Sequence, residues 1–209
     1  MRLILASTSP RRKELLSLLG LPFDLASPDY VEQVLPGKTA MDQAKEFAAG
    51  KARSCTVGSE DALVLGSDTL IGLDSEVLGK PTDLSEAAAM LRRMSGRRHV
   101  IYTGVALVGS EGRFCDVAVD TVQVTMKPFG ERELAAYIET GESLGKAGAY
   151  SIQGAGGALI ATIEGDFTAA VGLPLRLVAA MLAGRGMHCP MDLDRLYRER
   201  PYPNWGSFP

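Results

Sequence analysis

The sequence is poor in the residues that many catalytic and structural sites require. Among its 209 residues are two histidines and three cysteines, and they are not grouped at the spacings of a zinc site. The cysteines are also widely separated, which is typical of free thiols in a reducing compartment. We therefore expect a cytoplasmic protein with neither a zinc centre nor a disulfide framework.

Long apolar runs and an excess of positive charge are missing as well. No stretch approaches the roughly 18 apolar residues of a membrane span, and the opening MRLIL is too short for a signal peptide. The net charge is −3, so no general basic field would attract a nucleic acid. We expect neither a membrane nor a nucleic-acid partner, and any anion-binding site must be local.

Common nucleophile and nucleotide motifs do not occur in the chain either. It contains no GxSxG elbow and no GxxxxGK[ST] loop, and the glycine-rich stretch GKAGAYSIQGAGG does not complete a dinucleotide-binding fingerprint. A hydrolase built from this sequence would therefore need carboxylates and a hard divalent metal rather than a covalent nucleophile or zinc.

Strand-like and helix-like patterns alternate along the chain, which predicts a mixed α/β sheet. Residues 62–73 read as two strand-like runs on either side of Gly66–Thr69, and residues 99–126 contain an antiparallel pair. No repeat or low-complexity linker divides the chain. We expect one domain over residues 1–190 and an extended C-terminal extension over 191–209, which is rich in proline and aromatic residues. Strands are further expected at 2–6 and 22–27, and helices at 10–19, 39–55, 84–96, 131–141 and 174–186.

The stretch ASTSPRRKELL places two cations where the first strand passes into the first helix. Arg11 and Arg12 in a first helical turn oppose the helix dipole, which favours anions at that end. One interpretation is a phosphate-binding helix N-terminus, in which Ser7 and the two guanidinium groups hold an anion. The alternative is the start of a surface helix with two solvated arginines.

A second stretch, GSDTLIGLDSEVLGKP, contains an acid after an apolar run and a lysine between Gly79 and Pro81. Asp68 is expected at a strand end. It could be a solvent-facing residue of a turn, a metal ligand or a general base. Lys80 in its rigid setting suits a positioned cation. These residues alone leave all of these alternatives open.

Taken together and in order, five stretches resemble the Maf family of nucleoside triphosphate pyrophosphatases, once described as septum-formation inhibitors. The resemblance spans residues 5 to 175. It implies an elongated mixed sheet with flanking helices and two lobes around a cleft, as in the related inosine triphosphatases. It also implies hydrolysis of a nucleoside triphosphate to the monophosphate and pyrophosphate, with Mg²⁺, Mn²⁺ or Co²⁺, in a homodimer. The stretches are LASTSPRRKELL, GSDTLIGLDSEVLGKP, AAAMLRRMSGRRHVIYTGVAL, KAGAYSIQGAGG and GDFTAAVGLPL.

The resemblance also assigns roles to single residues. Asp68 matches the catalytic base of the family, and Glu32 matches a carboxylate near the metal. Ser7, Arg12, Lys51 and Lys80 match substrate-binding positions, the last three as phosphate-binding cations. The family usually has an acidic pair where this chain has Val31 before Glu32. Two alternatives follow for the metal ligands: either Asp29 substitutes, or Glu32 and Asp68 suffice.

Three further positions separate the branches of the family, and here they hold Arg11, Thr69 and Gln153. This trio is similar to the dTTP/UTP branch, whereas a 7-methyl-GTP branch differs at them. The amide of Gln153 has a donor and an acceptor, which suits the imide edge of uracil or thymine. The resemblance therefore implies dTTP and UTP as substrates. The alternatives are a pyrophosphatase for 7-methyl-GTP or other modified purine nucleotides, and a nucleotide-binding regulator of cell division.

Overall fold

The structure, a computed structural model, describes residues 1–33, 35–55 and 61–208. Helices and strands alternate along the chain, which confirms the predicted α/β class. The strands are β1 (Arg2–Ala6), β2 (Asp24–Ala26), β3 (Ala62–Leu73), β4 (Glu76–Leu78), β5 (Arg98–Gly109), β6 (Cys115–Met126) and β7 (Ile160–Glu164). The helices are α1 (Pro10–Ser17), α2 (Ala40–Ser54), α3 (Leu84–Met94), α4 (Glu131–Glu139), α5 (Phe167–Val171), α6 (Leu175–Ala183) and α7 (Leu193–Glu199).

The described strands form one seven-stranded mixed sheet in the order β2-β1-β3-β5-β6-β7, with β4 paired to β3 outside this path. β1 is parallel to both β2 and β3. The pairs β3–β5, β5–β6 and β6–β7 are antiparallel. This includes the antiparallel pair expected within residues 99–126.

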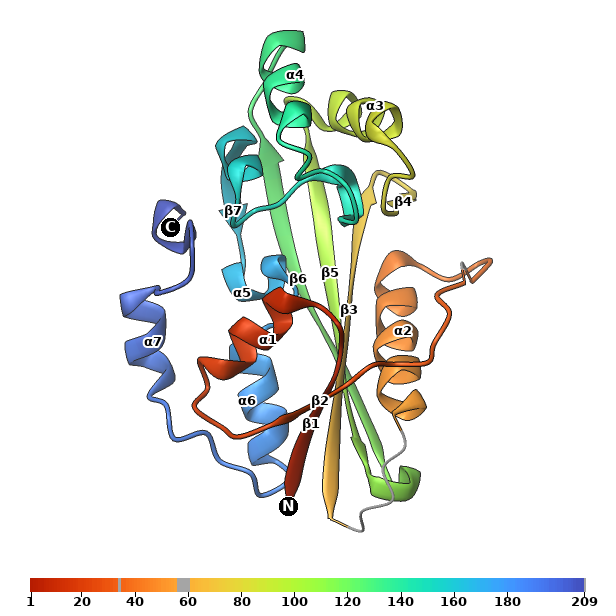
Figure 1. Ribbon diagram of the computed structural model, residues 1–209, viewed down its shortest axis with the longest axis vertical. Coiled ribbons are helices and arrows are strands. Elements are labelled where there is room, and N and C mark those ends of the chain that lie inside the picture. The colour runs from red at the N-terminus through yellow and green to blue at the C-terminus, as the bar shows by residue number, and fades with distance from the viewer. Residues whose placement is uncertain (34, 56–60, 209) are drawn as a thin grey trace.

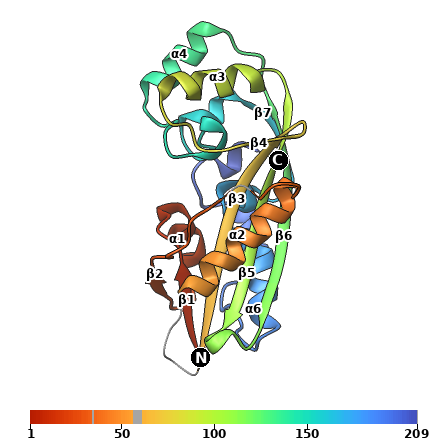
Figure 2. The same ribbon diagram turned by 90° about the vertical axis from the view of Figure 1, so that its right-hand side faces the viewer.

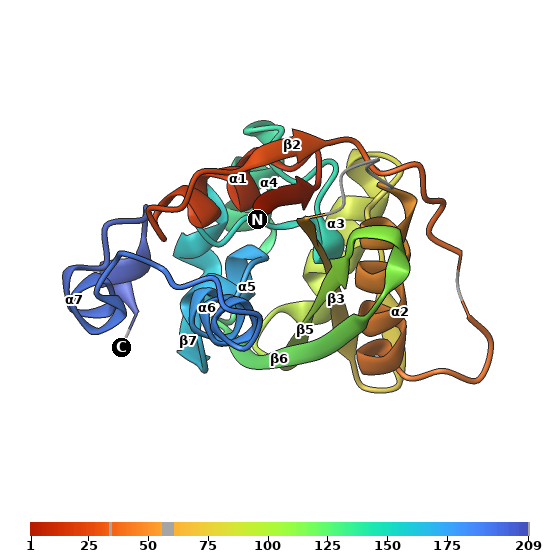
Figure 3. The ribbon, with the colours of Figure 1, turned by 90° about the horizontal axis from the view of Figure 1, so that it is seen from below.

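The sheet is covered on both faces at β1, so this strand is apolar and buried from Leu3 to Ala6 rather than alternating. Leu3 and Leu5 belong to the large core that α1 and α6 help to form, whereas Ile4 and Ala6 pack with α2 on the opposite face. Successive side chains of a strand point to opposite faces. Figure 3 shows α2 on one side of the long strands and α5 and α6 on the other.

The molecule is elongated, as expected, because β3, β5 and β6 run along most of its length (Figure 1). Helices α3 and α4 lie at one end of these strands, and α1, β1 and β2 lie toward the other end in both side views (Figures 1 and 2). Among the described residues no helix combines the length and the apolar character needed to cross a bilayer. The three cysteines are free.

The prediction of two strand-like runs in residues 62–73 is wrong, because β3 is one continuous strand. Its polar middle does not interrupt the ladder: Gly66, Ser67, Asp68 and Thr69 all stay paired with β5. Ser67 and Asp68 are buried. Their side chains find polar partners on neighbouring elements, which makes an uninterrupted strand possible. Asp68 therefore lies inside a strand and not at its end.

The prediction of an extended C-terminal segment is also wrong. Residues 193–199 form α7, whose first turn is capped by the carboxylate of Asp192, and residues 205–207 form a 3₁₀ turn. Trp205 and Phe208 are buried in the main core. Aromatic side chains bury large apolar areas, and this burial holds the segment against the domain. A domain boundary near residue 190 stays a prediction, and Pro209 lies outside the described residues.

Candidate active site

One edge of β3 is open near its middle. β1 pairs with β3 only as far as Gly66, and β4 begins to pair with it at Ile71. A cavity of about 880 Å³ lies beside this interval. Its walls include every site residue predicted from the sequence: Ser7, Arg11, Arg12, Glu32, Lys51, Asp68, Thr69, Lys80 and Gln153.

The N-terminus of α1 forms one wall of the cavity. Pro10 occupies the first turn, which contains no acidic residue. Ser7 accepts a hydrogen bond at Oγ from the backbone N–H of Ser9 at 3.2 Å and thereby shapes the approach to the helix. First-turn amides have no acceptor within a helix, so those of Arg11 and Arg12 can meet an anion.

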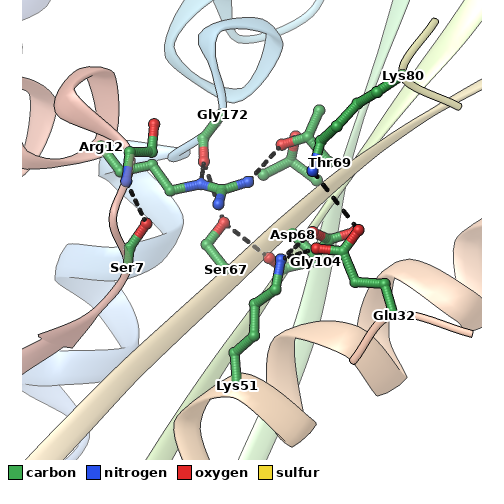
Figure 4. A network of polar contacts seen from close by, with 12 residues as sticks. Ser7, Arg12, Glu32, Lys51, Ser67, Asp68, Thr69, Lys80, Gly104 and Gly172 are labelled. Carbon is green, nitrogen blue, oxygen red and sulfur yellow. Dashed lines mark hydrogen bonds and ion pairs between the residues drawn. The ribbon is translucent and has the colours of Figure 1, made fainter. Parts of the chain in front are cut away.

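Arg12 is the more firmly held of the two arginines. Its Nε donates to the carbonyl oxygen of Gly172 at 2.9 Å, and its Nη2 donates to Oγ1 of Thr69 at 3.2 Å (Figure 4). Burial lowers the pKa of the Arg12 guanidinium, and the charge of Arg11 adds to that effect, whereas the Asp68 carboxylate opposes it. A half-buried cation beside an open cavity is suited to an anionic ligand.

Lys51 reaches the cavity because α2 lies unusually close to the sheet. A side chain at Gly66 of β3 would stand 2.3 Å from the carbonyl oxygen of Ala48, and one at Gly104 of β5 would stand 2.2 Å from that of Ala44. Ala44 and Ala48 are one helical turn apart, on the predicted buried side of α2. The absence of side chains at Gly66 and Gly104 thus allows α2, which carries Lys51, to pack closely against the sheet.

Lys51 bridges two carboxylates. Its Nζ lies 2.5 Å from Oδ1 of Asp68 and 2.6 Å from Oε1 of Glu32 (Figure 4). Lys80 lies 3.7 Å from the other oxygen of Glu32. Burial raises the pKa of Glu32, but the hydrogen bond and charge of Lys51, with help from Lys80 and Arg12, outweigh burial and leave the pKa below its ordinary value. Glu32 is therefore an anion at neutral pH.

The second oxygen of Asp68, Oδ2, is buried and has no hydrogen-bond partner among the described residues. Such an atom is costly unless a ligand, ion or water satisfies it. Asp68 and Glu32 supply hard oxygen ligands, which fit a divalent cation such as Mg²⁺ that takes its remaining ligands from water and phosphates. The described residues contain no cluster of three or more acidic, histidine or cysteine side chains suited to a metal.

The loop before Glu32 bears on the alternative metal ligand. Asp29 is exposed and is not among the residues that line the cavity, whereas Glu32 is. Val31 is 73% exposed. Of the two alternatives, this geometry favours Glu32 with Asp68.

Gln153 and Arg11 also line the cavity. Sequence reasoning missed Lys146 and Tyr150, which share these walls. Lys146 donates from Nζ to the carbonyl oxygen of Glu142 at 2.5 Å, and burial followed by the charge of Arg11 lowers its pKa. Both residues stand in the quoted stretch KAGAYSIQGAGG, so a search for cations near glycines would have found Lys146.

Comparison with known proteins agrees with this geometry. The family model described as "Maf-like protein" matches residues 2–185. A dTTP/UTP pyrophosphatase of Symbiobacterium thermophilum is 45% identical over 185 residues, covering 88% of this chain and 94% of the relative. One from Moorella thermoacetica is 46% identical, with 87% and 94% covered, and one from Thermotoga maritima is 42% identical, with 89% and 90% covered. With the family model spanning most of its length and all nine predicted residues around one cavity, the chain belongs to the Maf family.

Proposed function

We propose that this protein is a nucleoside triphosphate pyrophosphatase that hydrolyses dTTP and UTP to the monophosphate and pyrophosphate. The observation that carries the proposal is the unpartnered Oδ2 of buried Asp68 beside a cavity lined by Arg12, Lys51 and Lys80. The relatives, which are dTTP/UTP pyrophosphatases, support the substrate pair. They favour it over a modified purine nucleotide.

The cations of the cavity suit a triphosphate. The anionic oxygens of the substrate repel a nucleophile, and nearby positive charge reduces that repulsion and stabilises the charge that develops in the transition state. Arg12 is held by Gly172 and Thr69, so it meets a phosphate without first having to be ordered. Lys80 is the most exposed of the three cations, and its one ion-pair partner among the described residues is Oε2 of Glu32, which leaves it able to turn toward phosphate.

Asp68 is suited to act as the general base. Lys51 holds Oδ1, and Oδ2 is left to accept a proton. A water that gives this proton to Oδ2 attacks the phosphorus next to the nucleoside with its oxygen. The bond from that phosphorus to the bridging oxygen breaks, and pyrophosphate leaves with the bonding electron pair.

We further propose that Glu32 and Asp68 hold a divalent cation, Mg²⁺, Mn²⁺ or Co²⁺. When bound, the metal supplies positive charge that neutralises the phosphate oxygens. Lys51, which joins the two carboxylates, keeps them close together when no metal is bound. Hard oxygen ligands favour these metals over softer ones.

Gln153 with Arg11 and Thr69 would read the base. A uracil or thymine ring presents an N–H flanked by two carbonyl oxygens, and a glutamine amide can pair with both kinds of group. Cytosine has an acceptor where uracil has that N–H. A mismatched partner leaves a desolvated polar group unpaired, so discrimination against CTP should be strong.

The test is a screen of the purified protein with Mg²⁺ against dTTP, UTP, CTP, GTP and 7-methyl-GTP. We expect the highest kcat/KM for dTTP and UTP, with one monophosphate and one pyrophosphate formed per turnover. Excess EDTA should abolish the activity, and added Mg²⁺ or Mn²⁺ should restore it. A preference for 7-methyl-GTP would support the purine alternative, and nucleotide binding without turnover would support a regulator.

The Gln153→Glu variant isolates base recognition within the same assay. Its carboxylate would repel the carbonyl oxygens of uracil and thymine, so kcat/KM for dTTP and UTP should fall strongly. The melting temperature should change little. An unchanged ranking of the five substrates would refute the role of Gln153 and leave the pyrophosphatase proposal standing.

We also propose a cytoplasmic location, which the free thiols of the three cysteines suit.

A further inference from the structure

The loop that carries Gln153 is rich in glycine, and its own backbone hydrogen bonds, from the N–H of Gly154 to the carbonyl oxygen of Ser151 and from the N–H of Gly157 to that of Gly154, give it only part of its support. Three of the next four residues after Gln153 are glycines, namely Gly154, Gly156 and Gly157. Glycine gives the backbone wide conformational freedom, so a glycine-rich loop needs outside contacts to position a side chain. Gln153 itself is half-buried and its side chain makes no hydrogen bond to another described residue. Its direction is therefore set by whatever holds the backbone on either side.

One of the groups that hold this backbone comes from the C-terminal segment. Asn204 donates from Nδ2 to the carbonyl oxygen of Ile152 at 3.1 Å and to that of Gly154 at 2.9 Å. These two carbonyl groups flank Gln153 in the chain. The single amide thus holds the peptide group immediately before the base-reading residue and the peptide group between Gly154 and Ala155.

The packing between the loop and the C-terminal segment is incomplete beside Asn204, so the amide supports the loop on that side. A second hollow of about 440 Å³ lies next to the loop, lined by Gly154, Gly157, Asn204 and Phe208 among others. Side chains do not fill the space between the loop and the C-terminal segment there. On the far side, Glu142 accepts the backbone N–H groups of Ala155 and Gly156.

Asn204 is itself firmly placed. Its φ of 62° lies in the left-handed region, which asparagine tolerates better than most residues. The next residue, Trp205, is 4% exposed and stacks on Phe167 with ring centroids 5.7 Å apart. It also meets Tyr197 of α7 edge-on at 4.9 Å. An anchor of this kind lets the amide act as a fixed point.

The same segment reaches a second wall of the cavity. Tyr202 donates from Oη to the carboxylate of Glu14 in α1 at 2.9 Å, one turn beyond Arg11. Phe167, the partner of Trp205, begins α5, which also contributes Ala170 and Val171 to the cavity lining. The family model ends at residue 185, so Tyr202, Asn204 and Trp205 all lie outside the part of the chain that it matches.

From these contacts we infer that Asn204 is a specificity-positioning residue: the C-terminal segment forms part of the substrate site by fixing the Gln153 loop for pyrimidine recognition. The inference rests on the proposed function, because it concerns the residue assigned there to the base. Asn204 does not touch substrate in this scheme. It acts through Gln153, so its effect should appear in the choice of base and not in the handling of the triphosphate.

The first test is the Asn204→Gly variant, since glycine accepts the left-handed backbone and removes only the amide. The ratio of kcat/KM for UTP to that for CTP should fall about tenfold, as expected for the loss of two positioning hydrogen bonds. Binding of inorganic tripolyphosphate, which has no base, should stay as in the wild type. Asn204→Asp, which keeps the size but offers no donor, serves as the second variant and should give the same fall.

Tyr202→Phe is the matched control. It removes one hydrogen bond of the same segment, keeps the buried ring, and does not touch the Gln153 loop. We expect it to lower the melting temperature somewhat and to keep the UTP to CTP ratio. A fall in the ratio equal to that of Asn204→Gly would show a general loosening of the segment and would overturn the specific role of Asn204.

A double-mutant cycle and hydrogen exchange separate this inference from the proposed function. In a Gln153→Ala background, Asn204→Gly should have little further effect on the ratio, and additive effects would overturn the inference. Amide exchange in residues 151–157 should be about tenfold faster in Asn204→Gly than in Tyr202→Phe, with no substrate present. Unchanged amide exchange in Asn204→Gly would overturn the inference that Asn204 holds the loop, even if Gln153 reads the base. A Gln153→Ala protein with the wild-type ratio would refute the base-reading proposal itself, and the specificity role of Asn204 with it.

Discussion

At the scale of single residues, the two oxygens of Asp68 have different surroundings, and that difference suggests how the site works. Oδ1 contacts the ammonium of Lys51, whereas Oδ2 is buried without a partner among the described residues. Folding has thus desolvated an acceptor without satisfying it, which is costly unless a ligand completes the arrangement. We expect substrate, water or metal to supply the missing interaction.

The Asp68→Asn variant tests this role. Asparagine keeps the size of the side chain but cannot take a proton from water, so turnover of dTTP should fall roughly 10²-fold or more. The measurement is kcat in a steady-state pyrophosphate assay, with the melting temperature as a check that the variant is folded. Near-normal turnover would rule out Asp68 as the general base.

The buried His99 leads to a prediction about how the stability of the protein depends on pH, independent of catalysis. It is 1% exposed, and its Nε2 lies 2.8 Å from Oη of Tyr150. Burial lowers the pKa of His99 from 6.5 to about 4. The unfolded chain therefore takes up a proton below pH 6.5 that the folded protein refuses, so the stability is fully present above pH 6.5 and is lost as the pH falls toward 4.

The stability lost between pH 6.5 and pH 4 through His99 amounts to about 3 kcal/mol of unfolding free energy. The measurement is urea unfolding at pH 7 and pH 4 for the wild type and for His99→Gln, which keeps a polar partner for Tyr150 but does not titrate. In acid, the protonation of carboxylates lowers the stability of both proteins. The wild type should lose about 3 kcal/mol more than the variant, and equal losses would contradict a neutral buried His99.

At the scale of elements, the site depends on the close approach of α2 to β3 and β5. The alternation of the strand sends Asp68 toward α2 and its neighbour Thr69 toward Arg12 of α1. The two helices thus bring cations to adjacent residues of one strand. Gly66 and Gly104 set the distance of α2 from the sheet.

The Gly66→Ala variant tests whether this distance matters. The new methyl group would lie 2.3 Å from the carbonyl oxygen of Ala48 and 2.8 Å from the backbone nitrogen of Ala52, so the helix must move. We expect a loss of about 1–3 kcal/mol in stability. Activity should fall further than stability, because Lys51 moves away from Asp68 with the helix.

The control for this variant is Gly184→Ala at the end of α6, where the nearest heavy atom to a new methyl group is 3.4 Å away and the backbone is right-handed. It should leave the melting temperature and dTTP hydrolysis close to the wild type. A Gly66→Ala protein with unchanged activity would show that the spacing of α2 is not needed to place Lys51.

The sequence predicted elements well where a periodic pattern repeats over several residues. The α2 helix, with Ala44 and Ala48 on its buried side, and the β5–β6 pair were predictable for this reason. The polar Ser67–Thr69 interval read as a break because partners such as the Gly104 and Gly172 carbonyl oxygens are distant in the chain. Contacts of this kind are set by the tertiary fold and leave no local signal.

The nine site residues could be named from motifs, but the connections between them could not. Nothing in the local sequence indicates that Lys51 bridges Glu32 and Asp68, since the three lie on separate elements. The C-terminal segment was misread for a similar reason. Its prolines and aromatic residues suggest an extended surface chain, and only the position of Phe167 in the fold offers Trp205 a stacking partner.

At the scale of the whole molecule, the cavity is closed by segments from the entire length of the chain. Residues 7–9 and the start of α1 supply one wall, the 145–153 loop another, and the C-terminal segment supports both from outside. Removing either terminus should therefore affect the site and not only the stability. The burial of Trp205 and Phe208 within their own chain also means that these side chains are not available to a second subunit.

We predict a homodimer, on the basis of the family to which the chain belongs. Because Trp205 and Phe208 are already covered, the interface must use other surfaces, and changes in the C-terminal segment should not alter assembly. The measurement is light scattering coupled to size-exclusion chromatography over a range of micromolar concentrations. The wild type and Asn204→Gly should both show twice the mass of one chain, although only the variant should change its UTP to CTP ratio. A single-chain mass for the wild type throughout this range would contradict the dimer, and a change of mass in Asn204→Gly alone would connect the C-terminal segment to assembly and not only to the substrate site.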